Sequence, residues 1–321
     1  MKRYLSPLIL LSAAILWGLA FVMQKAATVI PTFTLLFSRS VIATVALIPV
    51  TVLFDKTSKC ERHLWNKEKR RPDINRRELV GGMICGIFLY AASALQQEGI
   101  SDTDAGITSF ITALYVVIVP IYALLFGKKS PLNAWLGVLI SVFGFYLLCI
   151  KDGFTMARSD LLVFGCAFIF AMHIMTVDAF LPGSDGIRLS LIQFATVSIL
   201  SLVSAIIFED IPEISEMVAV MPEILYLGIC SSGIAYTLQI IGQKNTKPAI
   251  ASIILSLESV FGALFSALVL KERMSLREYI GSALVFAAVI ISQTDFTLFR
   301  KSAREGKDGS AKNSISAKNS I

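Results

Sequence analysis

Apolar runs about 20 residues long recur along the chain and alternate with short polar segments. At about 1.5 Å of rise per residue, a helix of this length crosses the hydrocarbon core of a membrane. The pattern predicts ten such helices, near residues 7–27, 31–54, 79–97, 105–127, 133–150, 161–180, 189–208, 223–243, 248–270 and 275–293. The runs lack the alternation of apolar and polar residues that is typical of a membrane β-barrel. We therefore expect an all-α integral membrane protein.

Lysine and arginine are distributed unevenly over the polar segments. If the N-terminus is cytoplasmic, 22 of the 29 basic residues lie on the cytoplasmic side, 6 lie on the opposite side, and Arg39 lies within a span. Because basic residues are retained on the cytoplasmic side, this excess predicts that both termini are cytoplasmic. The basic loop 55–78 is the main anchor of this topology, and binding of anionic membrane lipid is a second interpretation. The tail 296–321 is polar, and we expect it to be disordered.

One stretch of the sequence occurs twice. Residues 95–129 align without gaps on residues 238–272, at an offset of 143, and 11 of the 35 positions are identical. The alignment superimposes predicted helices 3–5 on helices 8–10, so the repeating unit is five helices, in residues 1–150 and 151–295. Because five is an odd number, the second copy must enter the membrane in the opposite orientation. Such inverted repeats are typical of transporters that work by alternating access, with the substrate site near the membrane midplane.

Composition supports a polytopic membrane protein and argues against other classes. Hydrophobic residues make up 55% of the chain, charged residues only 16%, and the mean hydropathy is +0.72. The net charge of +6 does not indicate a protein that binds nucleic acid, because the basic residues lie in connecting loops and the tail. The five cysteines have the spacing of neither a metal site nor a disulfide framework, so we expect no metal.

Several segments resemble the EamA-type branch of the drug/metabolite transporter superfamily, over about residues 7–293. They are "WGLAFVMQKAA", "FSRSVIA", "AGITSFITALYVVIVPIYALLFGKK", "FAMHIMTVDAF", "GIAYTLQIIGQKNT" and "LSLESVFGALFSALVLKERMSLREYIGSALVFAAVIIS". The resemblance implies ten helices in two inverted halves, no cofactor, transport of small metabolites or drugs, and a bacterial inner membrane as the location. The family often ends helices 4 and 9 with a glutamate. Here Glu272 ends the second copy, but Lys129 stands at the matching position of the first.

Ionisable residues within the predicted spans are the first candidates for a transport site, because a charge at the bilayer centre costs at least about 2.5 kcal/mol. Glu258 is predicted to bind substrate or a proton, and the alternative is a neutral carboxyl bonded to a neighbouring helix. Arg39 is predicted to bind an anionic group of the substrate or to pair with Glu258 or Asp178, and the alternative is snorkelling to the surface. His173 is predicted to bind substrate or relay protons, and the alternative is a neutral side chain bonded between helices.

Uncharged polar and aromatic residues extend this set. Gln96 and Gln239 occupy matching positions of the repeat, and Tyr115 matches Glu258, so these side chains are predicted to contact substrate. The amides can instead tie helices together, for roughly 1 kcal/mol each. The remaining candidates are an amide and three aromatic side chains, which pack against helices or lipid in the alternative reading: Gln24, Trp17, Tyr90 and Tyr236.

Two features of the helix backbones also carry predictions. Pro120 removes a hydrogen bond inside helix 4 and is predicted to act as a hinge, although Ala263 stands at its position in the second repeat. Gly82 and Gly86 form a GxxxG motif, which favours close packing of helix 3 against a neighbour.

The expected function is transport of small metabolites or drugs by alternating access, in the direction of export. Uptake is the alternative direction, and a lipid flippase or a non-transporting membrane scaffold is the alternative class. An enzyme is not expected, because the spans hold no HExxH, no GxSxG and no paired aspartates. A channel is not expected, because neither a selectivity filter nor a ring of charges is visible. The expected partners are a small-molecule substrate and membrane lipid, and the expected state is a monomer or a homodimer.

Overall fold

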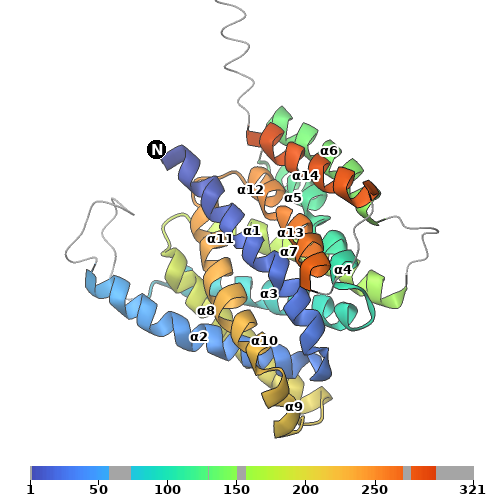
Figure 1. Ribbon diagram of the computed structural model, residues 1–321. Helices are drawn as coiled ribbons and strands as arrows, with labels where there is room; N and C mark the ends of the chain where they lie inside the picture. Colours follow the sequence, from blue (N-terminus) through green and yellow to red (C-terminus); the bar gives the residue numbers. More distant parts are fainter. Residues whose placement is uncertain (1, 58–73, 129, 150–156, 270–275, 294–321) are drawn as a thin grey trace, which may run out of the picture.

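The computed structural model of the protein describes residues 2–57, 74–128, 130–149, 157–269 and 276–293 (Figure 1). The tail 296–321 and most of the basic loop 55–78 lie outside these residues, as do Lys129 and Glu272, so what was expected of them stays a prediction. The described residues form helices joined by short turns, and no strand occurs among them. The predicted all-α class is therefore confirmed.

The helices follow the order expected from the apolar runs. The first repeat contains α1 (Lys2–Ala26), the 3₁₀ turn η1 (Ala27–Val29), α2 (Thr32–Thr57), α3 (Arg76–Asp102), α4 (Ala105–Thr112), α5 (Tyr115–Leu125) and α6 (Leu132–Cys149). The second repeat contains α7 (Arg158–Phe180), α8 (Gly186–Phe208), α9 (Ile214–Ala219), α10 (Met221–Leu225), the π-helix η2 (Tyr226–Ala235), α11 (Tyr236–Gln243), α12 (Pro248–Leu255), α13 (Leu257–Val269) and α14 (Leu276–Gln293).

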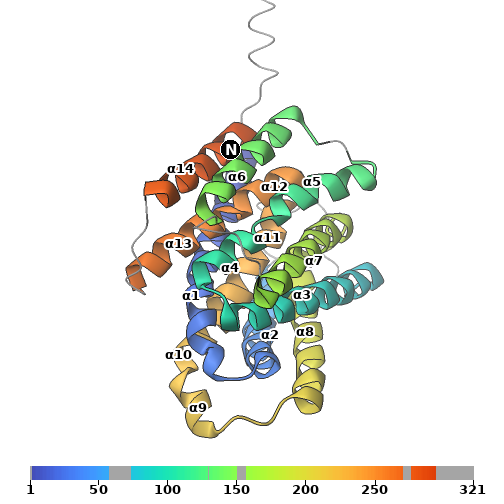
Figure 2. The same cartoon turned by 90° about the vertical axis from the view of Figure 1, so that its right-hand side faces the viewer.

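Eight stretches of the described residues are long and apolar enough to cross a membrane, where the sequence predicts ten. The predicted helices 133–150 and 275–293 correspond to two shorter apolar segments, Leu132–Gly144 and Tyr279–Ser292. These segments belong to α6 and α14, which pack along each other at one edge of the bundle (Figure 2). Eight spans are thus established by length and composition, and a count of ten depends on this pair of helices.

The distribution of polar and apolar side chains is that of a protein in lipid. Leu125 and Phe208 are 75% and 73% exposed, and many other large apolar side chains lie on the outside of the bundle. Arg39, His173 and Glu258 are buried inside it. Lipid tails cover apolar surface without cost, whereas a charged group in lipid is expensive, so the polar side chains gather in the interior.

Contacts at the helix ends fix the relative directions of α1, α3 and α7. Lys25, near the C-terminal end of α1, bonds carbonyl oxygens at the C-terminal end of α3, so these two helices run the same way. Arg77, at the start of α3, bonds the carbonyl oxygens of Ala179 and Phe180 at the end of α7, so α3 and α7 are antiparallel. The first helices of the two repeats, α1 and α7, therefore run in opposite directions, as inverted repeats require.

Helix packing divides the bundle into two groups that each contain spans of both repeats. The first group is α3, α4–α5 and α7, with α7 packed along all the others. The second group is η2–α11, α12–α13 and α1, with α1 packed along all the others. Exchanging the two repeats converts one group into the other, because α1 corresponds to α7, α3 to η2–α11, and α4–α5 to α12–α13. The pairs α2–α8 and α6–α14 join equivalent helices of the two repeats.

The GxxxG motif in α3 packs against α8. A Cβ atom added at Gly82 would lie 2.6 Å from Cβ of Ile192, and one added at Gly86 would lie 2.6 Å from Cβ of Thr196. Neither distance is possible for real atoms, so these positions require glycine at this separation of the helices. The predicted close packing is confirmed.

Candidate functional site

Two membrane spans are interrupted near their middles, at matching positions of the repeat. The span Ala105–Leu125 is divided into α4 and α5, and the span Pro248–Val269 into α12 and α13. At each break the backbone tightens into a turn closed by a bond to the third residue before it. The amide of Val116 donates to the carbonyl of Ala113 (3.0 Å), and the amide of Ser259 donates to that of Ser256 (3.1 Å). Ala113 and Ser256 keep right-handed helical backbone angles, so each break is a single tightened turn within its span. A 3₁₀ turn in the middle of a helix often marks a functional hinge.

Pro120 does not produce the break in its span. It lies inside α5, several residues beyond the interruption. The matching span has the same break although Ala263 stands in the place of proline. The interruption therefore belongs to the repeat and not to the proline, and the hinge role of Pro120 stays a prediction.

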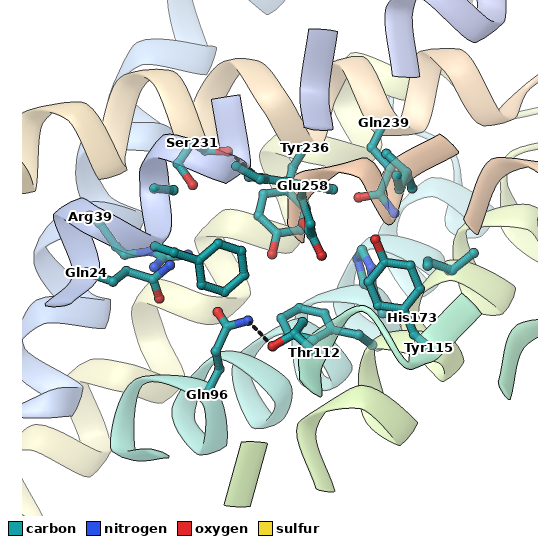
Figure 3. A pocket seen from close by; sticks show the side chains of 16 residues that line it. Gln24, Arg39, Gln96, Thr112, Tyr115, His173, Ser231, Tyr236, Gln239 and Glu258 are labelled. Atoms are coloured by element: carbon teal, nitrogen blue, oxygen red, sulfur yellow. Dashed lines mark hydrogen bonds between the residues drawn. The ribbon is translucent and has the colours of Figure 1, made fainter. Parts of the chain in front are cut away.

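A buried pocket lies between the two helix groups, and six pairs of equivalent residues line it. The pairs from α1 and α7 are offset by 153 residues, and those from the later spans by 143. They are Trp17 and Phe170, Ala20 and His173, Phe21 and Ile174, Gln96 and Gln239, Thr112 and Leu255, and Tyr115 and Glu258. Four lining residues fall outside this pairing: Gln24, Arg39, Ser231 and Tyr236. Both repeats thus contribute the same positions to one pocket (Figure 3).

All seven residues that the sequence singles out for substrate binding line this pocket, namely Glu258, Arg39, Tyr115, Gln239, Gln96, Trp17 and His173. Gln24 and Tyr236 line it too. Tyr90 does not, because its hydroxyl lies 2.5 Å from Oγ of Ser204 and its ring stacks on Phe33. The prediction that Tyr90 forms a wall of the site is therefore wrong.

Several polar atoms of the pocket are buried without a hydrogen-bond partner among the residues that the structure describes. They are Oε1 of Gln24, Nη1 of Arg39, Oη of Tyr115, Nδ1 of His173 and Oε1 of Gln239. A buried polar atom left unsatisfied costs about 1–3 kcal/mol, and most proteins keep such atoms few. Five such atoms around one pocket indicate a binding site, because a ligand that enters the pocket can form hydrogen bonds with them.

Arg39 belongs to α2, is bonded to η2 of the second group and lines the pocket. It is 4% exposed, and its Nε donates to Oγ of Ser232 over 3.2 Å. Among the described ion pairs it has no carboxylate partner, and Asp178 pairs with Lys128 instead. The predicted pairing of Arg39 with Asp178 is therefore wrong. Snorkelling is excluded too, because the guanidinium is buried inside the bundle.

Glu258 lies in the first turn of α13 and is 4% exposed. Its carboxyl lies beside the phenol of Tyr115, so equivalent positions of the two repeats meet at the pocket. Tyr236 stands within electrostatic reach of both Glu258 and Arg39. Neither Glu258 nor Arg39 takes part in an ion pair among the described residues, so the acidic and basic side chains of the pocket do not pair directly.

An aromatic cluster forms one wall of the pocket. The rings of Trp17 and Tyr236 lie 4.6 Å apart between centroids, and His173 meets Tyr236 edge to face at 5.9 Å. Trp17 donates from Nε1 to the carbonyl of Ser231 (3.3 Å). Nε2 of His173 lies 3.1 Å from Oε1 of Gln193, so one ring nitrogen is engaged and the other is not. Rings fixed in this way offer a rigid apolar surface to a ligand.

The repeat itself contains the signal for some of the pocket residues that single-residue reasoning missed. Phe170 matches the predicted Trp17, so the offset of 153 leads to it, whereas Thr112 and Leu255 match each other and neither is a candidate from the sequence. Thr112 accepts a hydrogen bond from Nε2 of Gln96 (3.1 Å, Figure 3). Ser231 carries no such signal, because the π-helix that turns it toward the pocket cannot be read from the sequence.

The pocket is small in this conformation. About 30 Å³ of it is open to the centres of water molecules, which is room for two or three of them. A metabolite larger than a few atoms needs the two helix groups to separate. Within the part of the chain that the structure describes, no three His, Cys, Asp or Glu side chains are grouped as a metal site would need.

Comparison with known proteins adds the family to this architecture. The chain matches the EamA-like transporter family twice, over residues 5–150 and 157–294. It is 33% identical over 214 residues to a protein of Archaeoglobus fulgidus named "Uncharacterized transporter", which covers 65% of this chain and 67% of that protein. A solved structure described as "Crystal structure of protein" is similar with a TM-score of 0.69 and 19% identity, covering 89% of this chain and 96% of that one. At such identity the likeness concerns the fold alone.

Proposed function

The chain belongs to the EamA-like transporter family, and we propose that it exports small polar or amphipathic metabolites by alternating access through the central pocket. It is a membrane transporter, as its family and its apolar helices indicate. In the proposal the membrane is a bacterial inner membrane, the chain crosses it ten times, and both termini are cytoplasmic. Monomer and homodimer are equally compatible with this mechanism, because the pocket lies within one chain.

One observation supports the proposal above the others. The same positions of two oppositely directed repeats line a single pocket that holds unpartnered polar atoms. A chain built in this way has two related packings, in which either helix group takes the arrangement of the other. One packing gives access from one side of the membrane, and the second gives access from the opposite side.

The side chains of the pocket suggest how a substrate is held. Arg39 offers Nη1 to an acidic or carbonyl oxygen, and Gln24 and Gln239 offer Oε1 to donors. The aromatic wall of Trp17 and Tyr236 packs against an apolar part. A ligand with a polar end and an apolar body satisfies both kinds of surface, and this complementarity is the reason to propose a small polar or amphipathic metabolite.

Glu258 is the proposed site of proton coupling. It stands in the first turn after the break in its span and is buried in the pocket, and a charged carboxyl at this depth is costly unless it gains a partner. If Glu258 releases its proton when a cationic or donor group of the substrate binds, transport of the substrate is coupled to movement of a proton. His173 is the second candidate, although its Nε2 is already engaged by Gln193.

The test is an untargeted comparison of the medium from cells that produce the wild type, Glu258→Gln or Glu98→Gln at equal membrane levels. Glu98 is an exposed glutamate at the end of α3, so its variant controls for the loss of a negative charge away from the pocket. A solute enriched outside with the wild type and Glu98→Gln, but not with Glu258→Gln, supports export through this pocket. A solute depleted from the medium in the same pattern means uptake instead. If all three media are alike for every solute, export is contradicted.

A further inference from the structure

The two helix groups are bonded to each other at one end of the pocket by Lys25. Its Nζ donates to three carbonyl oxygens at the end of α3, those of Ile100 (3.0 Å), Ser101 (2.9 Å) and Thr103 (3.1 Å). The last carbonyls of a helix have no partners within it and carry partial negative charge, so a lysine is well suited to them. Lys25 belongs to α1 in the second group, and α3 belongs to the first. This contact therefore closes the bundle between the groups.

The turn after α3 is itself fastened to the first group. Oγ1 of Thr103 donates to Oδ1 of Asp160 (3.1 Å) in the first turn of α7. A second bond crosses between the groups nearby, from Nε2 of Gln97 to the carbonyl of Gln24 (3.3 Å). Separation of the groups at this end requires that Lys25 release the turn. We call this region the Lys25 end.

The repeat places a counterpart of this contact at the opposite end of the bundle. Lys25 matches Asp178 at the offset of 153 that relates the pocket residues of α1 and α7. The turn 100–104 matches residues 243–247, "QKNTK", at the offset of 143. Asp178 lies one residue before Ala179, which accepts a bond from Arg77 at the start of α3. Since Lys25 bonds the end of α3, the two sites are about 36 Å apart along that helix.

At the Asp178 end the equivalent partners stand apart. Asp178 and residues 243–247 line a second pocket, of which about 390 Å³ is open to the centres of water molecules, and among the described residues no hydrogen bond or ion pair joins them. Asp178 pairs with Lys128 of its own group. Within the described residues, the ammonium groups of Lys244 and Lys247 make no hydrogen bond or ion pair and are exposed.

A thin seal separates this second pocket from the central one. Gln239 lines the central pocket, and Gln243, one turn further along α11, lines the second. The seal includes one bond between the groups, from Nε2 of Gln243 to the carbonyl of Ile174, and at 3.4 Å this bond is long. The Lys25 end is therefore closed by several polar contacts, while the Asp178 end is open almost to the substrate pocket.

We infer that Lys25 and Asp178 are alternating latches of the transport cycle, of which the structure shows the Lys25 latch closed and the Asp178 latch open. In the opposite conformation Lys25 releases the end of α3, and Asp178 leaves Lys128 for Lys244 or Lys247. The charges suit both states, since a cation meets the C-terminus of α3 and an anion meets two lysines beside the N-terminus of α12. The inference rests on the proposed alternating access, and it assigns the closing contacts to named residues.

The alternative is that Lys25 merely caps α3 and has no part in the cycle. The two readings differ in the direction of the effects. Loss of Lys25 removes contacts of the present conformation only, and loss of Lys244 and Lys247 removes contacts of the opposite conformation only. If the two sites are latches, loss of Lys25 and loss of Lys244 and Lys247 shift the ratio of the two conformations in opposite directions, although both remove positive charge. If Lys25 is only a cap, its loss lowers stability and leaves this ratio unchanged.

The experiment measures distances between pairs of spin labels in purified protein, so it needs no substrate and does not depend on transport. One pair, on Val29 and Ser101, reports the Lys25 end, and a second pair, on Ala179 and Asn245, reports the Asp178 end. All four positions are exposed, and the native cysteines are replaced by alanine. The variants compared are Lys25→Gln, Lys25→Arg as the charge-retaining control, and the double variant Lys244→Gln/Lys247→Gln.

With Lys25→Gln, the ratio of conformations is expected to move at least about fivefold toward a long distance at the Lys25 end and a short one at the Asp178 end. Lys25→Arg should resemble the wild type. The double variant should shift the ratio of conformations in the opposite direction. Because Lys244 and Lys247 are exposed, their replacement is expected to leave the fold intact. Unchanged distances in both Lys25→Gln and the double variant, or shifts in the same direction, overturn the inference. If distances shift as expected but the comparison of media shows no solute, the latches stand and the proposed export fails.

Discussion

Tyr115 and Glu258 occupy the same position in the two repeats, and each lies in the first turn of the half-helix that follows a break in its span. Their side chains meet at the central pocket, although 143 residues separate them in the sequence. The backbone is thus repeated while the chemistry is not, because one repeat supplies a phenol and the other a carboxyl. A symmetric framework of this kind lets the helix groups exchange conformations, while the only carboxyl among the residues that line the pocket comes from the second repeat.

Replacement of Arg39 by glutamine is expected to lower transport of the exported solute by about tenfold or more, which corresponds to the loss of a hydrogen bond to a charged group. Folding should be unaffected or improved, because among the described residues one nitrogen of the buried guanidinium has no hydrogen-bond partner and no carboxylate pairs with it. Export rate and thermal unfolding in detergent are measured on the same preparation. A large drop in unfolding temperature would show that Arg39 holds the fold and not the substrate.

Proton coupling is expected to depend on Glu258 more than on His173. In proteoliposomes, wild type and His173→Gln should accumulate solute in response to an imposed pH gradient, and Glu258→Gln should not. The reason is that Nε2 of His173 is engaged by Gln193, while Glu258 stands at the helix break in the pocket. Gradient-driven accumulation by Glu258→Gln, equal to that of the wild type, would remove this carboxyl from the coupling mechanism.

Alanine at Gly86 is expected to destabilise the protein by about 1–3 kcal/mol, because the added Cβ would lie 2.6 Å from Cβ of Thr196 and force α3 and α8 apart. Gly165 provides the matched control. A Cβ at that position meets only Cδ1 of Leu95 at 3.6 Å, an ordinary contact. Unfolding of both variants in denaturant should therefore separate them clearly, and equal stabilities would contradict the close packing.

Replacement of Pro120 by alanine is expected to preserve the helix break and to leave transport within about twofold of the wild type. The matching span is interrupted in the same way with Ala263 at this position, so proline is not needed for the shape. The initial rate of export at equal membrane levels is the measurement. A rate reduced tenfold or more in a well-folded Pro120→Ala protein would support the hinge role that the sequence predicts for this proline.

Much of the fold could be predicted because lipid imposes simple rules on sequence. Continuous apolar runs, the duplicated segment and the glycines of α3 led to the helical class, the repeat and the packing of α3. Single ionisable residues in apolar helices also predicted the pocket, because a group such as Glu258 is too costly to expose to lipid and must face the interior of the bundle. The sequence-based predictions are wrong where a side chain has a partner from a distant segment. Asp178 forms an ion pair with Lys128, and the hydroxyl of Tyr90 bonds Ser204. The breaks in two spans and the π-helix η2 could not be predicted, because the apolar residues continue through these segments without any change in their pattern.

If the protein works by alternating access, its central pocket opens in turn to each side of the membrane, and a thiol placed in the pocket reports this directly. Ser231 lines the pocket and is 1% exposed, so Ser231→Cys in a protein whose native cysteines are alanine places one thiol inside it. A membrane-impermeant thiol reagent is added to right-side-out and to inverted vesicles, with Ala167→Cys, a fully buried core position, as the unreactive control. Alternating access predicts labelling of Cys at 231 from either side and none at 167. Labelling from one side only, or from neither, would contradict a pocket that carries substrate across.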